Sequence, residues 1–473
     1  MRNNRYIKTG LCALWALYVL CVTGCDLSGL VWLKAILCVA GFAALSFAVS
    51  KCEEDKTVAA IILAGIAVRT FYVLYTGCEQ RQHDVGEFDT YLENNYHAEY
   101  IEYIFNNWAL LDEDIRLHWQ FYHPPLHHFI CAVFYKIATT IVPAAKGHWD
   151  ILQALPLFYS LVTMEVIRKV AGDFAKTKKS LHIALLATVL HPQLFVFSGA
   201  LNNDCLAVMF TCIAIERALA WNRDRTFPKI IQVALAIGLG MGTKLSAGLV
   251  AFPVGYIFLA SLIEKGDFKK RRTLIFQYIV FAIICVPLAL WYQIRNYIKW
   301  GVALNYIAIP DIDLNPGLVI TANAWQRFFD FDLSKDYNII VTTLDESVFD
   351  GDYYRDNLML ALLGFFMAAA AAIVAALSFA GLIRTLIKNR NRQTLALAIF
   401  VIAELLFYVI FCFKYPYTCT QSFRYIAPIL LARGPFITNL EESDSALLKT
   451  GTAASVYAFA GLSVIFYCLA WLN

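Results

Sequence analysis

The sequence predicts an all-helical, polytopic membrane protein, and three observations carry this prediction. Apolar residues make up 59% of the 473 residues and charged residues only 16%, too few to cover the surface of a soluble protein of this length. Apolar runs of helix length recur from Leu11 to the C-terminus. Lysine and arginine gather in short connectors between these runs, a pattern typical of the cytoplasmic loops of membrane proteins.

Fourteen apolar segments are long enough to cross or enter a membrane, at roughly 20 residues per crossing. They are 11–25, 28–50, 57–77, 124–143, 151–170, 180–198, 204–221, 228–243, 246–264, 273–293, 358–385, 394–413, 425–440 and 450–471. The first follows a basic N-terminus, as the apolar part of a signal peptide does. A second apolar segment follows at once with no small-residue cleavage site between them, so we expect the first to be retained as a span.

The distribution of positive charge decides the path of segment 124–143. The strongly basic connectors are 168–179, 221–229, 264–272 and 383–392. With the N-terminus inside, three crossings place the polar stretch 78–123 outside, and a full crossing by 124–143 would then put 168–179, 264–272 and 383–392 outside as well. A segment that lies along the interface, or dips in and returns, leaves every basic connector cytoplasmic. Pro124 and Pro125 suit such an entry, so we predict about 13 crossings and an external C-terminus.

The stretch from Glu79 to His128 concentrates the titratable groups of the chain. It holds six of the nine histidines and ten carboxylates, against two arginines. General acid–base chemistry and ligand binding use these residue types, so we expect the functional site here. Asp84, with His83 and Glu87, follows a span by a few residues and could hold a general base, although such pairs also occur in solvated acidic loops.

The tetrapeptide His123-Pro124-Pro125-Leu126 places a histidine where the chain enters the membrane. The two prolines stiffen this entry, although prolines also begin ordinary helices. His118, His123, His127 and His128 could together form a zinc site, but clustered histidines at an interface more often form hydrogen bonds. The sequence leaves the presence of a metal open.

The predicted topology brings further polar residues to the same external face. Asn203 and Asp204 begin one span and could simply cap its helix. Lys244 lies within apolar sequence, where a charge is costly and is either functional or reaches the interface with its head group. Arg295 and Arg424, the latter followed by Tyr425, could grip a phosphate with forked hydrogen bonds. Two arginines together with Lys244 predict a pocket for an anionic head group.

These motifs, in this order, resemble the protein O-mannosyltransferase-like family. That family belongs to the polytopic GT-C glycosyltransferases, which also include the aminoarabinose transferases of bacterial lipid A. The matching motifs are the external acidic motif, HPPL at 123–126, NND at 202–204, TKLSAGL at 243–249, RNYIKWG at 295–301 and FRYIAP at 423–428. The resemblance covers roughly residues 57–430. It differs at the first motif, where the family commonly has Asp-Glu and this chain has His83-Asp84.

The resemblance implies a GT-C-like bundle with a helical first external loop, and roles for individual residues. Asp84 matches the aspartate of the first loop and would be the general base, with His83 beside it. His123 would line the same cavity, and Asp204 matches the second acidic position. The expected substrate-binding residues are Glu87, Asn203, Lys244, Arg295, Arg424 and Tyr425.

The chain divides accordingly into four expected parts. They are an N-terminal transmembrane hairpin (1–56), a GT-C-like catalytic module (57–310) that includes the external loop 78–150, a further external loop (311–357) and C-terminal transmembrane helices (358–473).

The resemblance further implies an inverting transfer of a sugar from a polyprenyl-phosphate donor to an acceptor hydroxyl on a lipid, a glycan or a protein. No nucleic acid is expected as a partner. No cofactor is assigned, and a divalent cation stays open, because GT-C enzymes include metal-dependent and metal-independent members. The chain has no N-x-Ser/Thr sequon, which favours a bacterial inner membrane over the endoplasmic reticulum membrane of a eukaryote.

Two other functions compete with the transferase. A transporter or flippase of lipid-linked sugars would carry charges on broken helices within the membrane, whereas here only Lys244 and Glu404 lie away from span ends. A non-catalytic envelope assembly protein would have no use for the clustered histidines and carboxylates. A cavity that holds Asp84, Asp204 and a cationic cluster would favour the transferase.

Overall fold

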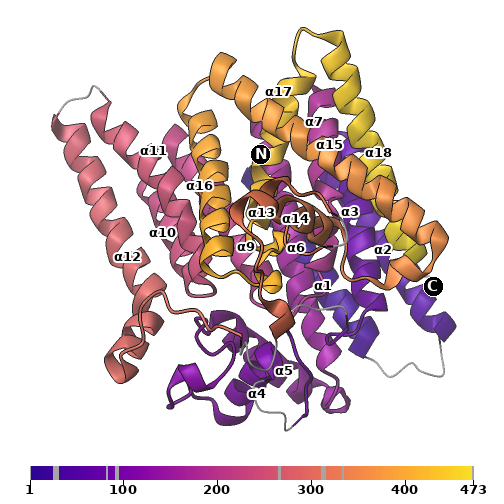
Figure 1. The fold of residues 1–473 in the computed structure, drawn as a ribbon, viewed down its shortest axis with the longest axis vertical. Helices are drawn as coiled ribbons and strands as arrows, with labels where there is room; N and C mark the ends of the chain where they lie inside the picture. Colours follow the sequence, from indigo (N-terminus) through magenta and orange to yellow (C-terminus); the bar gives the residue numbers. More distant parts are fainter. Residues whose placement is uncertain are drawn as a thin grey trace.

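The fold is known from a computed structural model that describes residues 2–24, 31–80, 84–90, 95–264, 268–310, 316–332 and 335–470. These residues form helices and loops, with one isolated β-bridge between Val319 and Tyr417 (Figure 1). The α-helices are α1 (Arg2–Gly24), α2 (Val31–Cys52), α3 (Lys56–Tyr75), α4 (Tyr96–Asn107), α5 (Leu126–Ile141), α6 (Ala154–Phe174), α7 (Lys178–Val189), α8 (Pro192–Val196), α9 (Asp204–Arg223), α10 (Phe227–Met241), α11 (Ala251–Ile263), α12 (Phe268–Trp300), α13 (Ala324–Phe329), α14 (Ile339–Val348), α15 (Leu358–Lys388), α16 (Arg392–Lys414), α17 (Leu430–Glu441) and α18 (Ala446–Ala470). The predicted all-helical membrane fold is confirmed.

Each of the fourteen apolar segments expected from the sequence contains a helix. Within the described ranges, eight helices are long and apolar enough to span a membrane, and shorter apolar helices add to them. The count of about 13 crossings stays a prediction. Segment 180–198 is divided into α7 and α8 between His191 and Pro192, where proline begins the second helix because its position needs no backbone N–H donor.

Large apolar side chains cover the outer surfaces of the long helices. Ile283 on α12, Phe365 on α15 and Ile402 on α16 are all more than half exposed. Such surfaces suit a hydrocarbon environment, where an apolar side chain costs nothing and an unpaired polar group is costly. The bundle interior is packed around α9, α10 and α17 in one cluster and around α3, α6, α7 and α18 in another.

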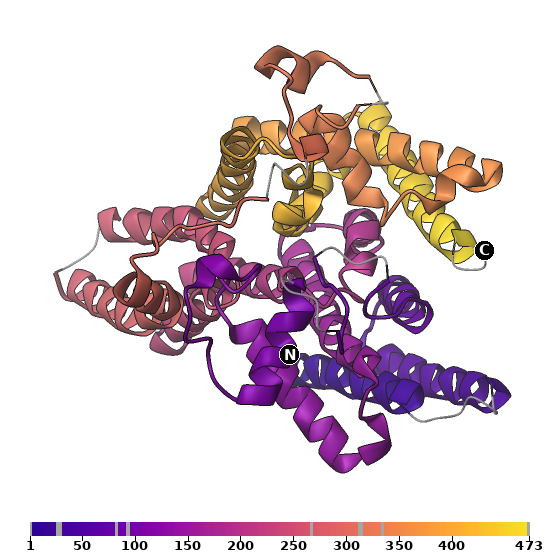
Figure 2. The same cartoon turned by 60° about the horizontal axis from the view of Figure 1, so that its bottom comes forward.

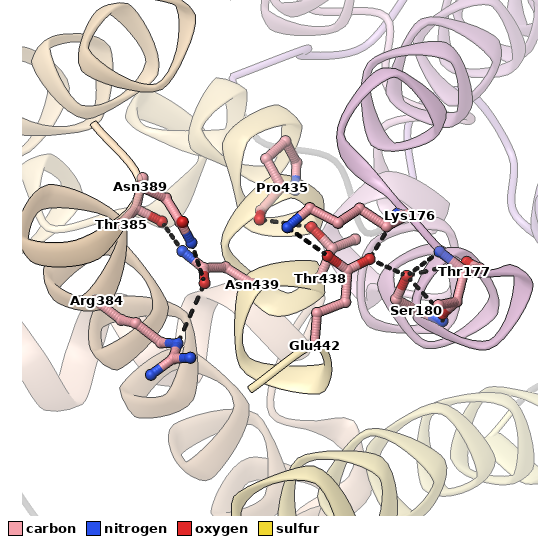
Figure 3. Close-up of polar contacts among 10 residues, drawn as sticks. All are labelled: Lys176, Thr177, Ser180, Arg384, Thr385, Asn389, Pro435, Thr438, Asn439 and Glu442. Atoms are coloured by element: carbon pink, nitrogen blue, oxygen red, sulfur yellow. Dashed lines mark hydrogen bonds and ion pairs between the residues drawn. The ribbon is translucent and has the colours of Figure 1, made fainter. Parts of the chain in front are cut away.

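The basic connectors meet at one end of the bundle. Arg223 pairs with Asp173 at 2.9 Å, and Glu264 pairs with both Arg225 at 2.5 Å and Arg392 at 3.2 Å, so the four connectors are linked to one another. Figure 3 shows a neighbouring part of this end, where residues of the α6–α7 connector and of α15 bond to the last turn of α17. All four connectors therefore lie at the same end of the bundle, and their location in the cytoplasm stays a prediction of the charge pattern.

The long loop between α3 and α6 lies at the opposite end. Glu53, just before α3, pairs with Arg168 near the end of α6 at 3.4 Å, so α3 begins and α6 ends on the basic side. The loop between them therefore leaves and returns at the other end, and α5 does not cross the bundle. There α4 and α5 pack together beneath the spans (Figures 1 and 2). The backbone N–H of Leu126 fastens α5 to the carbonyl of Gly242, 3.2 Å away.

Close packing of α15 on α17 gives a test of the bundle. A Cβ atom at Gly381 would collide with the backbone carbonyl of Phe436, whereas Gly451 on α18 faces open space. Gly381→Ala should lower the free energy of unfolding by about 1–3 kcal/mol, because overpacking forces the two helices apart. Gly451→Ala should be neutral or slightly stabilising. Thermal unfolding of the purified protein in detergent measures both, and equal melting temperatures for the two variants would contradict the predicted contact.

Candidate active site

A cavity of about 400 Å³ lies where the loop after α3, the start of α9, the turn after α10 and the loop after α16 meet. Its polar lining residues include Asp84, His97, Gln120, Tyr122, His123, Asp204, Lys244, Ser246, Asn305, Tyr306, Glu404, Tyr408, Tyr415, Tyr417, Thr420, Arg424 and Tyr425. Its apolar wall comes from the segment after Lys244 and from α16. The cavity therefore combines a charged mouth at the end of the bundle with an apolar interior among the spans.

Backbone geometry fixes Asp84 at the mouth of this cavity. Asp84 has a φ of 59°, in the left-handed region that aspartate tolerates better than most residues. Its carbonyl accepts a hydrogen bond from the backbone N–H of His97 at 3.1 Å. Gly86 follows with a φ of 79° directly against the backbone of Asn95, where a side chain would not fit. The first loop is thus bent back onto α4, and Asp84 is held in a defined position.

Asp84 and Asp204 share one arginine. Nη1 of Arg424 lies 2.6 Å from Oδ2 of Asp84 and 3.6 Å from Oδ2 of Asp204, and Lys244 binds Oδ1 of Asp204. Asp204 is only 3% exposed, and Arg424 is 6% exposed. Two carboxylates and two cations therefore form a neutral, largely buried network, which we call the ion network.

Tyr425 completes the cationic side of the ion network. Its ring lies 5.0 Å from Nζ of Lys244 and 4.9 Å from the guanidinium of Arg424, so that both cations face the aromatic surface. Its hydroxyl oxygen accepts a hydrogen bond of 3.0 Å from Nη2 of Arg424. Burial alone would lower the pKa of Arg424, but the charges of Asp84 and Asp204 outweigh it and raise that pKa well above its ordinary range. Arg424 therefore stays charged at every physiological pH.

The asparagines before α9 position Asp204. The side-chain oxygen of Asn202 accepts a hydrogen bond of 3.1 Å from the backbone N–H of Asp204. Asn203 donates from Nδ2 to the carbonyl of Thr243 at 3.2 Å, which ties the start of α9 to the turn that carries Lys244. The Oδ1 atom of Asn203 is buried and finds no partner within the described part of the chain. Asn203 thus helps to hold Asp204 and Lys244 next to each other.

Three stacked histidines form one wall of the site. Nδ1 of His97 lies 2.7 Å from Nε2 of His128, and the ring of His97 stacks against that of His123 at a centroid distance of 5.8 Å. Burial lowers the pKa of His97 to about 3, and burial together with the charge of Lys244 lowers the pKa of His123 well below its ordinary value. Both imidazoles are neutral at physiological pH and can donate and accept hydrogen bonds.

Three of the residues expected to bind substrate do not line this cavity, and one of them is Asn203, which lies behind Asp204. Arg295 donates to the carbonyl of Leu111 at 2.6 Å and packs on Trp300, so it fastens α12 to the first loop and gives no support for a phosphate-binding role. The side chain of Glu87 is exposed and does not line the cavity. His83 lies outside the described residues.

Several lining residues were not selected as site residues from the sequence. His97 has a recoverable signal, because the buried positions of α4 recur with helical spacing and include it. Glu404 also lines the cavity, and its signal is a lone carboxylate within the apolar run 394–413. No sequence signal distinguishes Tyr306 and Tyr408, because tyrosines are frequent throughout this chain. Among the described residues, no group of three or more His, Cys, Asp or Glu side chains is arranged to hold a metal ion.

Comparisons with known proteins agree with this geometry. Residues 122–291 match the model of the dolichyl-phosphate-mannose-protein mannosyltransferase family. Two solved structures of ArnT from Cupriavidus metallidurans are similar to the whole bundle. The form bound to undecaprenyl phosphate has 16% sequence identity and a TM-score of 0.51, and covers 88% of this chain and 76% of its own. The apo form has 15% identity and a TM-score of 0.53, and covers 88% and 77%. No curated protein sequence matches significantly.

The family match and the shared fold confirm the resemblance that the motifs indicate. The matched region includes His123, Asp204 and Lys244, and the fold similarity extends over nearly all of the chain.

The buried histidines predict how stability depends on pH. The pKa of His97 is about 3 in the folded protein and near its ordinary value of 6.5 in the unfolded chain, so between these values only the unfolded chain binds the proton. Stability should therefore fall as the pH is lowered from 7 to 5, by up to about 1.4 kcal/mol per pH unit for each such histidine.

Thermal unfolding in detergent at fixed ionic strength measures this dependence. His97→Gln should show a shallower fall than the wild type, whereas the exposed His148→Gln should follow the wild type. A His97→Gln profile parallel to that of the wild type would refute the assignment to His97.

Proposed function

We propose that this membrane glycosyltransferase of GT-C type moves a sugar from a polyprenyl-phosphate donor to an acceptor hydroxyl, with inversion at the anomeric carbon. The observation that supports this most is the meeting of Asp84, Asp204, Lys244 and Arg424 in one cavity with an apolar interior. A lipid-linked sugar phosphate needs the same two environments, a cationic one for the phosphate and an apolar one for the prenyl chain.

Lys244 and Arg424 are the groups proposed to bind the donor phosphate. A guanidinium binds phosphate and carboxylate oxygens with the same forked geometry, so the site that now holds two carboxylates also suits a phosphate. The ring of Tyr425 contacts both cations, which helps to hold them close together. Asp204 anchors Lys244 and prevents it from turning away to solvent.

The prenyl chain is proposed to follow the apolar wall of the cavity. Leu245 and Leu249 form one part of this wall, and Phe407 and Phe411 of α16 form another. Contacts with the chain bury apolar surface and add affinity without affecting the reacting atoms.

The proposed reaction is a single displacement. Asp84 accepts the proton of the acceptor hydroxyl while the hydroxyl oxygen forms a bond to the anomeric carbon. The bond between that carbon and the phosphate oxygen breaks, and the electron pair leaves with the polyprenyl phosphate. Lys244 and Arg424 offset the charge that grows on the leaving group. The neutral imidazole of His123 lines the cavity and is proposed to orient the acceptor.

The pairing of Asp84 with Arg424 sets the order of events in this proposal. A carboxylate that is paired with a guanidinium is a weak base, because the pairing stabilises its charged form. The donor phosphate would compete with Asp84 for Arg424 and so release the base only when the donor is present.

The location of the site at the end opposite the basic connectors supports a reaction at the external face. The positive-inside rule would make the basic end cytoplasmic, together with the N-terminus. The acceptor would then approach from outside the cell membrane, beside α4 and α5.

The role of Asp84 is testable with a purified enzyme and a panel of polyprenyl-phosphate sugars. Asp84→Asn should lower the transfer rate at least about 100-fold, because an amide cannot accept the proton, and should leave donor binding largely intact. Glu87→Gln, a change of the same kind on the exposed neighbour, should transfer normally. Near-normal turnover by Asp84→Asn would exclude Asp84 as the base.

The phosphate site is tested separately by donor binding. Arg424→Gln and Lys244→Gln should each weaken binding of the polyprenyl-phosphate donor by about tenfold or more, since each removes a charge-assisted hydrogen bond. Arg295→Gln should leave donor affinity unchanged, because Arg295 contacts the first loop. Equal losses in all three variants, measured by equilibrium binding in detergent, would argue against a phosphate site at Lys244 and Arg424.

A further inference from the structure

A second cavity, of about 410 Å³, lies on the other side of α16 from the candidate active site. It is bounded by α14, α15, α16 and the start of α17. In Figure 1, α15 and α16 diverge from their short connector, and α14 lies in the opening between them. Ala371, Ala372 and Ala375 of α15 give this cavity a smooth apolar wall. Its rim, at Ile340 and Phe379, is exposed on the apolar surface of the bundle.

Arg433 of α17 lines this cavity and is a buried cation without a counter-charge. It is 7% exposed, and its one hydrogen bond is long, 3.5 Å from Nη1 to the carbonyl of Ala187. Within the described ranges, no carboxylate lies within ion-pair distance of it. Among the described residues, no carboxylate balances its charge, and a buried charge without a partner is destabilising unless an anion binds beside it.

The other buried arginines show how this chain normally satisfies such a group. Arg69 is fully buried and donates to Ser160 and to the carbonyls of Gly65 and Val189, all at 3.0 Å or less. Arg424 is paired with two carboxylates. Among the described residues, Arg433 has no comparable set of hydrogen-bond acceptors, and its side chain borders the cavity.

Further polar groups lie close to Arg433 on the cavity wall. His191, between α7 and α8, is 1% exposed and borders the cavity with its ring stacked on Phe423. Thr343 and Ser347 of α14 also line the cavity, where Thr343 shares a hydrogen bond with the hydroxyl of Tyr408 and Ser347 donates to the carbonyl of Leu344. Nδ1 of His191 accepts a hydrogen bond from the backbone N–H of Gln193, so Nε2 carries the proton of the neutral ring and can donate it to a phosphate oxygen.

We propose that this cavity binds an anionic phospholipid of the membrane, with its phosphate at Arg433 and an acyl chain along the alanine wall of α15. A phosphodiester carries one negative charge, which a single guanidinium balances. The polyprenyl phosphate that is left after sugar transfer is a monoester with a charge of roughly −1.5 to −2, as for phosphoserine, and matches the two cations of the first cavity better. The phospholipid site is separate from the donor site and does not depend on the function proposed above.

Lipid binding to the purified full-length protein in detergent tests this inference. Native mass spectrometry or retention of labelled lipid should show phosphatidylglycerol bound in preference to the zwitterionic phosphatidylcholine. Arg433→Gln should weaken phosphatidylglycerol binding by about tenfold or more, and Arg433→Lys should retain much of it. Arg424→Gln, in the donor cavity, should bind phosphatidylglycerol as the wild type does.

A pair of cavity variants supplies a control that leaves the charge in place. Ala375→Phe fills the cavity and should block phosphatidylglycerol binding, whereas Ala369→Phe adds the same ring on an exposed part of α15 outside the cavity and should not. Size-exclusion profiles and melting temperatures identify any variant that fails to fold, and if Arg433→Gln fails, the loss of binding expected in Ala375→Phe decides the test.

Three results would overturn the proposal. The first is equal binding of phosphatidylglycerol and phosphatidylcholine. The second is unchanged phosphatidylglycerol binding in both Arg433→Gln and Ala375→Phe. The third is displacement of phosphatidylglycerol from the wild type by an equal concentration of undecaprenyl phosphate, which would assign the cavity to the polyprenyl lipid.

Discussion

The ion network of Asp84, Arg424, Asp204 and Lys244 is the constraint on which the architecture of this end of the molecule depends. A charge removed from water is tolerated only when opposite charges and hydrogen bonds surround it. Removal of one partner leaves the other charge buried and unpaired, which destabilises the folded protein. Asp204 and Arg424 are almost completely buried, so each needs an oppositely charged partner that another segment brings into position. The first loop, the start of α9, the turn after α10 and the loop after α16 are far apart in sequence, and their charges hold them together.

The supporting contacts follow from this constraint. The left-handed backbone at Asp84 and the glycine at 86 bend the first loop toward the network, and α5 is tied to the same turn that carries Lys244. The neutral histidine wall adds no charge, so the balance of two carboxylates and two cations is preserved. The opposite end has its own polar layer, in which Glu264 joins Arg225 and Arg392 and keeps the ends of the spans together.

Much of the fold could be predicted because hydropathy and charge act locally along the chain. Every long apolar run contains a helix, and the basic connectors alone place α5 outside the set of crossing helices. Asp84, Asp204 and Arg424 could be selected from the sequence, because each lies in a motif that resembles one of a known family. Arg295 was selected in the same way, but its side chain bonds to the first loop and does not line the cavity. A motif gives the position of a residue in the sequence and does not give the direction of its side chain. Tyr408 and the cavity at Arg433 depend on how helices pack against one another, which no local pattern encodes.

The bond between Asp84 and Arg424 also bears on how a catalytic cycle of the proposed kind would end. A spent carrier that keeps its phosphate on two buried cations would leave slowly, and slow release would limit turnover. In the proposed order Asp84 gives up Arg424 when the donor binds, remains close by, and would take the arginine back once its own proton is lost. Asp84 would then compete with the leaving group for Arg424, so that the groups that stabilise departure of the phosphate would not retain it afterwards.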